Sequence, residues 1–481
     1  MKEVHKKSID PAVNQALVTA YRSKTPLIWD RAEAMQPQCG FGRLAICCSD
    51  CQDGPCRTNP LSEEAQQTIC GRDKYDLVAG HFLQKAADGA LALTKLAGQS
   101  GTGFRDEAIR QLAVSDDEMM VFEDIAERLN VIGRCTNAAL ADLCQYQREA
   151  GGDWQPAVVG VNLGVLQAES VNIVFHGHVD RQVVAGFKAA AHNENIAVTL
   201  AGMCGNEFSG SFPLPVVTNY DSQEAPLLTG LVDLLVIGSQ CVMPSLRKLA
   251  GQRGIAVLRA TPAATATEYK AAVLAAHQAC QRRKSTPVCP AAYSNACIGY
   301  TADNSVAVFE HVVKQYEQGK IQGVVYLGGC GVVANTQDEQ PVRLAAALID
   351  AGYLVITAGC AGTALAKAGM CQPAWRNGDY TLCGVLPPDV PPVLHLGSCH
   401  DAGELLGIAA LLQQRLPLAA VFPEINHNKV LATAIGFSVA GIHTWLGYEP
   451  IPDDAVLPGS SILPLPAVPE LLQALMEAAK K

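Results

Sequence analysis

The chain has 481 residues, of which 49% are hydrophobic and 17% are charged, and its formal net charge is −10. This length predicts more than one domain, because a single hydrophobic core stops growing near ~250–300 residues. The acidic balance without any Lys/Arg cluster excludes nucleic-acid binding, which requires basic groups against the phosphates. No apolar run reaches the roughly 20 residues of a membrane span and none follows the charged N-terminus, so we expect a cytoplasmic protein without a signal peptide.

Residues 1–151 are predicted to form a mostly helical domain. Apolar residues recur at three-and-four spacing over residues 75–97 and 116–131, with acidic residues near both starts. From residue 152 onward, short apolar runs alternate with Ala-rich helical stretches, which is typical of parallel sheets covered by helices on both faces. The predicted strands lie within residues 171–179, 196–202, 233–241, 255–260, 323–330, 353–360, 392–399, 419–424 and 437–445.

A polar, Pro-containing stretch at residues 280–290 separates two sets of predicted strands. We therefore predict an α/β fold class, in which the N-terminal helical domain is followed by two Rossmann-like parallel-sheet domains over residues 152–286 and 287–481. No G-x-G-x-x-G follows a predicted strand with the spacing of a dinucleotide fingerprint, so the sequence does not support nicotinamide binding.

Eighteen cysteines are unusual for a chain that we expect in a reducing compartment, where cysteine-rich patterns point to metal or redox chemistry. Four of them directly follow predicted strands: Cys241, Cys330, Cys360 and Cys399. Because ligands of open α/β sheets bind beyond the carboxyl ends of the strands, these thiolates are predicted to converge on a metal cluster between the domains. Seven others share no motif and are interpreted as small buried hydrophobic residues: Cys135, Cys144, Cys280, Cys289, Cys297, Cys371 and Cys383.

Six cysteines near the N-terminus form a second array with the spacing C-x7-C-C-x2-C-x4-C-x13-C. They are Cys39, Cys47, Cys48, Cys51, Cys56 and Cys70. A zinc site would use four of them and leave two over, whereas thiolates this dense suit cubane iron–sulfur clusters. If the last four bind one cluster, the first two supply half of another, which a symmetric dimer would complete on its two-fold axis. The array therefore predicts a homodimer.

The assembled motifs resemble those of a known enzyme family. They are "CCSDCQDGPCR", "HGHV", "GNE", "TNYDSQE", "QCVMPSL", "GGCG", "GCAGTALAKAG" and "GSCHD", spread from about residue 39 to 450. The chain resembles the catalytic subunit of the anaerobic nickel–iron carbon monoxide dehydrogenases and, more distantly, the hybrid-cluster proteins. The resemblance implies the reaction CO + H2O to CO2 + 2 H+ + 2 electrons at a Ni-Fe-S cluster. Electrons would leave through two accessory 4Fe-4S clusters to a ferredoxin-like carrier.

The resemblance also implies which residues carry each role. The active-site cluster would be held by one histidine and five cysteines: His178, Cys204, Cys241, Cys330, Cys360 and Cys399. Cys48, Cys51, Cys56 and Cys70 would bind the 4Fe-4S cluster within the subunit, and Cys39 and Cys47 the cluster shared across the dimer. Lys429 would stabilise charge developing on the CO2 oxygens, with His427 as a second catalytic residue.

Two departures from the family pattern keep an alternative open. Met203 stands where the family has its ligand cysteine, and Cys204 comes one residue later, which on an extended segment turns a side chain to the opposite face. The histidine ladder that the family carries after the position of Cys70 is also missing. The alternative is a nickel-free hybrid-type Fe-S-O cluster, with Glu207 as a possible oxygen ligand, that reduces a small substrate such as hydroxylamine.

Overall fold

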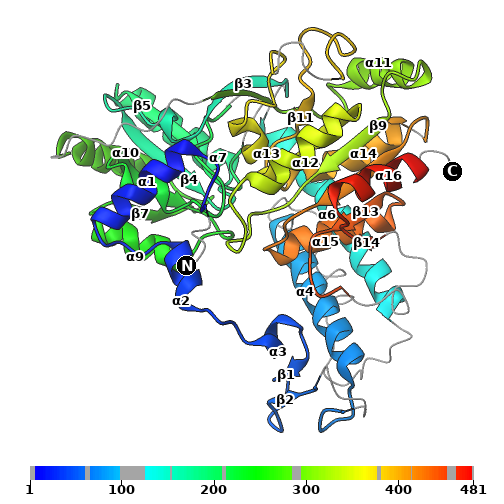
Figure 1. The fold of residues 1–481 in the computed structure, drawn as a ribbon. Coiled ribbons are helices and arrows are strands. Elements are labelled where there is room, and N and C mark those ends of the chain that lie inside the picture. Colours follow the sequence, from blue (N-terminus) through cyan, green and yellow to red (C-terminus); the bar gives the residue numbers. More distant parts are fainter. Residues whose placement is uncertain are drawn as a thin grey trace.

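The structure is a computed structural model that describes residues 6–59, 66–97, 125–151, 154–207, 213–283, 294–375, 381–412, 414–451 and 462–478. A four-stranded sheet with its helices lies beside an eight-stranded sheet with its own (Figure 1). The N-terminal cysteine array projects below both, beside one end of a long helix, α4 (Figure 1). The α/β fold with parallel sheets after a helical N-terminal region confirms the predicted fold class.

The smaller sheet is covered by helices on both faces. Its four strands are parallel and lie in the order β5 (Val198–Gly202), β4 (Val171–His176), β6 (Val232–Ile237) and β7 (Ala256–Arg259). Since side chains alternate across a strand, Val174 and Leu235 pack on one side, while Phe175 and Val236 pack on the other. The first side is covered by α1 (Pro11–Arg22), α8 (Ala225–Leu228) and α9 (Pro244–Gln252), and the second by α7 (Arg181–Asn193) and α10 (Ala266–Gln281).

The larger sheet is parallel except at one edge. Its order is β14 (Ile462–Pro464), β13 (His443–Leu446), β12 (Leu418–Phe422), β9 (Gly323–Leu327), β10 (Tyr353–Thr357), β11 (Val393–His395), β8 (Ser294–Ile298) and β3 (Ala157–Val161), and only β3 runs antiparallel to its neighbour. Its helical elements are α11 (Val306–Glu317), α12 (Glu339–Asp350), α13 (Gly359–Lys367), η4 (Asp401–Gly403), α14 (Glu404–Leu412), α15 (Asn428–Val439) and α16 (Val468–Ala478). The central strands are fully buried, as expected for a sheet with helices on both faces.

Two long helices, α4 (Lys74–Ala97) and α6 (Ile125–Gly151), pack against α15. Glycines allow this close contact, because a Cβ added at Gly89 of α4 would lie 2.0 Å from the backbone oxygen of Asn428. A Cβ at Gly133 of α6 would lie 2.5 Å from the side chain of Val439. The two long helices therefore contact α15 at both of its ends, at Asn428 and at Val439.

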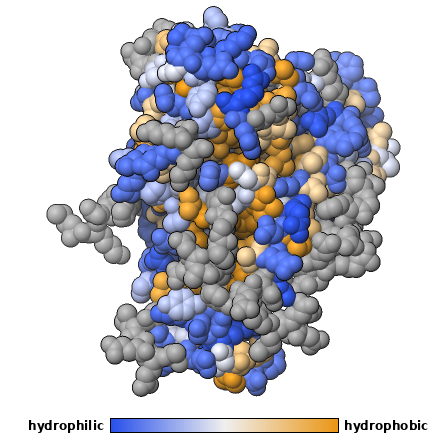
Figure 2. All heavy atoms as spheres, turned by 90° about the vertical axis from the view of Figure 1, so that its right-hand side faces the viewer, coloured by the Kyte–Doolittle hydropathy of each residue, from blue (hydrophilic) through white to orange (hydrophobic). Residues whose placement is uncertain are grey.

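The remaining elements are short. They are α2 (Ile28–Ala34), α3 (Gly40–Arg43), the antiparallel pair β1 (Cys47–Cys48) and β2 (Cys56–Arg57), and η3 (Leu163–Val165). No helix among the described residues is long and apolar enough to cross a lipid bilayer. On the face turned to the right in Figure 1, hydrophobic residues form a band bordered by hydrophilic ones (Figure 2).

Some predicted elements differ from those in the structure. The run 437–445 was predicted as a strand, but its first three residues end α15 and the strand begins at His443. Short apolar runs do not separate a buried helix end from a strand, which explains the error. Strands β3, β8 and β14 were not predicted, and β3 joins the larger sheet although its residues fall in the predicted middle domain. The domain boundaries themselves stay a prediction.

We expect Gly89→Ala to lower the apparent melting temperature measured by circular dichroism. Its methyl group would press on the Asn428 carbonyl and the Lys429 amide, and overpacking of this kind costs about 1–3 kcal/mol. Gly251→Ala on α9 is the matched control, because no atom lies within 4 Å of its added Cβ, and it should leave stability unchanged or raise it by about 0.4–1 kcal/mol. Equal melting temperatures for Gly89→Ala and Gly251→Ala would contradict the close packing of α4 against α15.

Candidate metal centre

The predicted cluster ligands all leave the carboxyl ends of strands. His178, Cys204 and Cys241 follow β4, β5 and β6 of the smaller sheet, and Cys330, Cys360 and Cys399 follow β9, β10 and β11 of the larger one. In the larger sheet Leu327 pairs with Thr357, and Thr357 pairs with His395. The three cysteines come three or four residues after these partners, so they lie at about the same distance beyond the ends of their strands.

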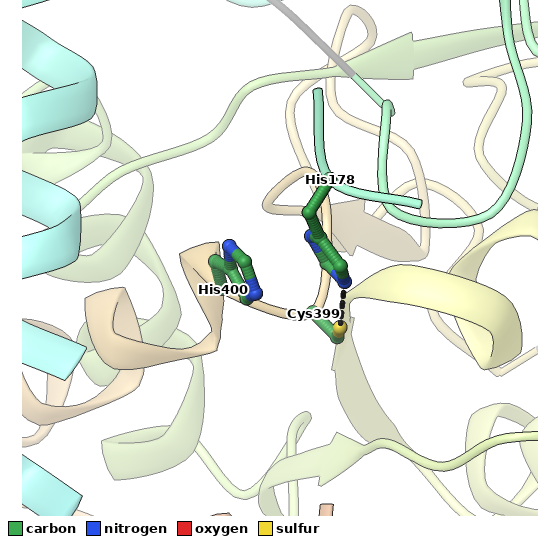
Figure 3. Close-up of side chains that lie close together, drawn as sticks. All are labelled: His178, Cys399 and His400. Atoms are coloured by element: carbon green, nitrogen blue, oxygen red, sulfur yellow. Dashed lines mark hydrogen bonds between the residues drawn. The ribbon is translucent and has the colours of Figure 1, made fainter. Parts of the chain in front are cut away.

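The two sheets bring their thiols together. The Cys204 and Cys360 sulfur atoms lie 3.3 Å apart across the boundary between the sheets. The Nε2 atom of His178 lies 3.5 Å from the Cys399 sulfur (Figure 3). The same atom lies 3.9 Å from the Cys241 sulfur. Besides burial, the charges of Cys360 and Cys241 raise the pKa of Cys330, so its thiol lies near theirs. Residues from six different strands thus face one shared space.

Cys204 reaches this space despite its shifted position in the sequence. Met203 is fully buried in the apolar core of the smaller sheet, so its side chain points away from the thiols. The backbone N–H of Cys204 donates to the Thr218 carbonyl and its carbonyl accepts from Gly177, which turns the chain just after β5. The segment is therefore no longer extended at residue 204, and the rule that neighbouring side chains point to opposite faces does not exclude Cys204.

Two of these residues have unusual backbone conformations. His178 and Cys241 both have φ of 61°, in the left-handed region that L-residues seldom occupy. Left-handed backbone at a non-glycine residue costs roughly 1–2 kcal/mol, and such strain gathers at functional sites. In this backbone conformation His178 Nε2 lies 3.9 Å from the Cys241 sulfur.

The protein environment changes the pKa values of several of these cysteines in opposite directions. The hydrogen bond from Cys204 holds the pKa of Cys241 well below its ordinary value, with the Lys429 ammonium acting in the same direction. Burial raises the pKa values of the Cys330 and Cys399 thiols. A cysteine binds a metal as its thiolate. Metal binding at this site therefore has to release protons from the cysteines that are still thiols.

Lys429 is the cation of the site. It lies in the first turn of α15, is 5% exposed, and contacts His178 Nε2 at 2.5 Å and Gln240 Oε1 at 2.9 Å. Burial alone would lower the pKa of Lys429, but the Cys241 thiolate raises it above its ordinary value, which keeps the ammonium charged. Burial and Lys429 together lower the pKa of His178 to about 4, so its imidazole is neutral and can bind a metal.

Two other predicted residues lie at the edge of the site. His427 is the N-cap residue of α15 and packs edge-on against the ring of Tyr220, with centroids 4.6 Å apart. Glu207 is fully buried and accepts hydrogen bonds from the Gly205 amide and the Thr363 hydroxyl. Burial raises the pKa of Glu207 to about 7, and both of its oxygens already have protein partners.

The donor set fits a metal cluster better than a single ion. Within the described part of the chain, the one group of three or more potential ligand residues whose donor atoms all lie within 4.8 Å of one another is His178, Cys399 and His400. No three of the five cysteines come that close together, so they are not arranged around a single point as the ligands of a zinc site are. A group of several metal ions, which takes its ligands on different sides, suits this spread of thiols.

His400 was not predicted as a site residue. The histidine directly after the cysteine in "GSCHD" was the available signal, because it follows a predicted ligand at a strand end. His176, in contrast, is fully buried and its Nε2 is bonded to Gln223, which is an ordinary structural role. Of the seven cysteines predicted to be buried hydrophobic residues, Cys135, Cys144 and Cys371 are buried. The prediction is wrong for Cys383, which is exposed, and for Cys280 and Cys297, which are only half-buried, and Cys289 lies outside the described residues.

The N-terminal array is separate from this centre and much more open. Cys39, Cys51 and Cys70 are exposed, Cys47 and Cys56 are half-buried, and Cys48 is buried. The β1–β2 pairing places Cys48 opposite Cys56, and the Cys47 carbonyl bonds to His81 of α4. The structure therefore holds the array at one end of α4, where the exposed thiols can meet another molecule.

Known proteins with similar sequences are carbon monoxide dehydrogenases. The chain is 28% identical to carbon monoxide dehydrogenase 2 of Carboxydothermus hydrogenoformans, over 96% of this chain and 94% of that protein. It is also 28% identical to the carbon monoxide dehydrogenase of Rhodospirillum rubrum, over 92% and 91% of the two chains. The first alignment spans 601 positions, so that relative has segments that this shorter chain lacks.

Solved structures and a family match agree with these relatives. Carbon Monoxide Dehydrogenase IV from Carboxydothermus hydrogenoformans has the same fold, with a TM-score of 0.86 and 24% identity over 99% of both chains. A nickel-free carbon monoxide dehydrogenase from Thermococcus sp. AM4 has a TM-score of 0.84 and 21% identity, over 98% of this chain and 96% of that one. Residues 111–452, well over half of the chain, match the Prismane/CO dehydrogenase family. The protein belongs to the Prismane/CO dehydrogenase family.

Proposed function

We propose that this oxidoreductase interconverts CO and CO2, following CO + H2O to CO2 + 2 H+ + 2 electrons, at a nickel–iron–sulfur cluster between its two sheets. The observation that carries the proposal is the convergence of five thiols, one neutral imidazole and one buried ammonium on a single space. The carbon monoxide dehydrogenases with similar sequences support the same reaction.

Each group of the chain has a distinct task in this proposal. His178, Cys204, Cys241, Cys330, Cys360 and Cys399 would hold the cluster, which when bound supplies the redox-active metal for CO and the Lewis acid that activates water. Lys429, which is buried, places a fixed positive charge beside His178. Such a charge stabilises negative charge that develops on the oxygens of CO2 during the reaction. His427, at the start of the same helix, remains a proposed second catalytic residue.

The placement of Cys204 favours nickel over the nickel-free alternative. That alternative rested on the loss of one thiolate, yet the Cys204 sulfur lies 3.3 Å from that of Cys360. It also required a carboxylate oxygen from Glu207, whose two oxygens are engaged with Gly205 and Thr363. Both features support a complete set of five thiolates.

Electrons would leave through the N-terminal array. We propose that Cys48, Cys51, Cys56 and Cys70 bind a 4Fe-4S cluster and that Cys39 and Cys47 share another with a second subunit, because the exposed thiols of the array lie outside the core. The partners would then be a second copy of the chain and a ferredoxin-like carrier. A cytoplasmic location stays a prediction from the sequence.

Elemental analysis of anaerobically purified protein, expressed with nickel supplied, should find about one nickel per chain beside a full iron load. CO-dependent reduction of a viologen dye should accompany the nickel. Full iron without nickel and without CO oxidation would refute the proposal and leave the hybrid-type reductase as the better explanation.

Cys330→Ala should abolish CO oxidation and remove about four irons per chain, since a cubane cluster that loses a thiolate ligand does not assemble stably. Spectra of the N-terminal clusters should persist. Cys371→Ala is the matched control, because Cys371 is a fully buried cysteine of the larger sheet's core rather than a proposed ligand. It should retain iron and activity, and similar losses in both variants would point to misfolding.

Lys429→Met should keep the iron and nickel contents but lower kcat for CO oxidation by about 100-fold or more, the usual effect of removing one fixed charge that stabilises a transition state. Lys270→Met serves as the control, since Lys270 is paired with Glu194 away from the site. Full activity of the Lys429 variant would exclude its proposed catalytic role.

A further inference from the structure

The ring of His400 lies flat against that of His178. The two ring centroids are 3.6 Å apart and the ring planes differ by 13° (Figure 3). His400 follows Cys399 directly, at the start of η4, and only 5% of it is exposed. One whole face of the His178 imidazole is therefore covered by a second imidazole.

The backbone of Gly205 lies against the other face of His178. A Cβ added at Gly205 would lie 2.8 Å from both Cε1 and Nε2 of the ring and 2.9 Å from Cδ2. Because these distances are nearly equal, the added Cβ would lie over a face of the ring. This is the face away from His400, because the stacked ring of His400 leaves no room on the other. The imidazole of His178 is thus held between Gly205 and His400.

A histidine that binds a metal is ordinarily oriented by a hydrogen bond from its other ring nitrogen to a carboxylate or a carbonyl. His178 faces the thiols of Cys399 and Cys241 with Nε2, so Nδ1 is its other nitrogen. That Nδ1 atom is buried and has no hydrogen-bond partner among the described residues. The usual orienting contact is missing from the described part of the site, and the stacked ring takes its place.

We propose that His400 is a positioning residue whose ring holds the His178 imidazole in line with the cluster. This inference rests on the proposed function, in which His178 is a cluster ligand. His400 acts through the flat face of its ring rather than through a nitrogen, since its own Nε2 is buried without a partner. The lone pairs of an imidazole lie in its ring plane, and these two planes are nearly parallel with centroids 3.6 Å apart. One metal ion therefore cannot lie in both planes without turning a ring.

The test compares anaerobically purified wild-type protein with His400→Phe, His400→Ala and His178→Ala. Pulsed EPR of the reduced active-site cluster measures the coupling to a bound histidine nitrogen, and steady-state assays give kcat and KM. We expect His400→Ala to weaken or broaden the nitrogen coupling and to lower kcat by about 10- to 100-fold. His400→Phe, which keeps a flat ring, should restore the coupling and bring kcat within about threefold of wild type, inside the usual effect of losing an orienting partner.

The outcomes separate this inference from the proposed function. Wild-type protein without nitrogen coupling, or coupling that survives in His178→Ala, would refute His178 as a ligand and with it the site as proposed. Wild-type coupling that is unchanged in His400→Ala would overturn the positioning role alone. Equal damage in His400→Phe and His400→Ala would also overturn it, because a nitrogen of His400 would then matter rather than its ring face.

Discussion

Thiols from two separate sheets meet in one buried space, with the Cys204 and Cys360 sulfurs 3.3 Å apart. Buried thiolates repel one another and lose their hydration, so apposition of this kind is unfavourable unless positive charge compensates for it. The described residues supply one such charge, the Lys429 ammonium, which contacts His178. A metal cluster would supply the rest, and the other features of the site follow from this need to gather anionic ligands around cations.

The helices serve the same centre from outside the sheets. Because α4 and α6 press on α15 at Gly89 and Gly133, the first turn of α15, which carries Lys429, is held against the strand ends. Substitutions in α4 or α6 would therefore alter the rate of the proposed reaction by moving the Lys429 ammonium, although they lie far from the thiols in sequence. Catalytic geometry depends on such support, because small displacements of a fixed charge weaken its effect on the transition state.

A buried ion cluster joins the two sheet systems on another side of the site. Lys367, at the end of α13, pairs with Asp338 at 2.7 Å and with Asp10 at 3.2 Å. Asp10 caps α1, which covers the smaller sheet, while Asp338 precedes α12 of the larger one. Asn219 donates to Asp338 at 2.6 Å and to the Cys360 carbonyl at 3.4 Å, which links the ion cluster to the segment that bears a proposed ligand. Removing one member of a buried ion pair typically costs about 3–5 kcal/mol, so Lys367 is expected to contribute to the stability of the contact between the two sheet systems.

Sequence patterns alone were enough to predict the fold class, most of the strands and the place of the strand-end cysteines. The reason is that fully buried parallel strands appear as short apolar runs that end in glycine. The spacing of the cysteines singled out the N-terminal array, whereas Lys429 was singled out only by the resemblance to the carbon monoxide dehydrogenases. The sequence patterns did not predict β3, whose place in the larger sheet depends on pairing with β8, far along the chain. The direction of Cys204 toward the other thiols, with Met203 in the core, depends on contacts between distant residues, because a turn held by Thr218 and Gly177 sets it. The stacking of His400 on His178 was likewise beyond the sequence, since two rings 222 positions apart meet only when both sheets are assembled.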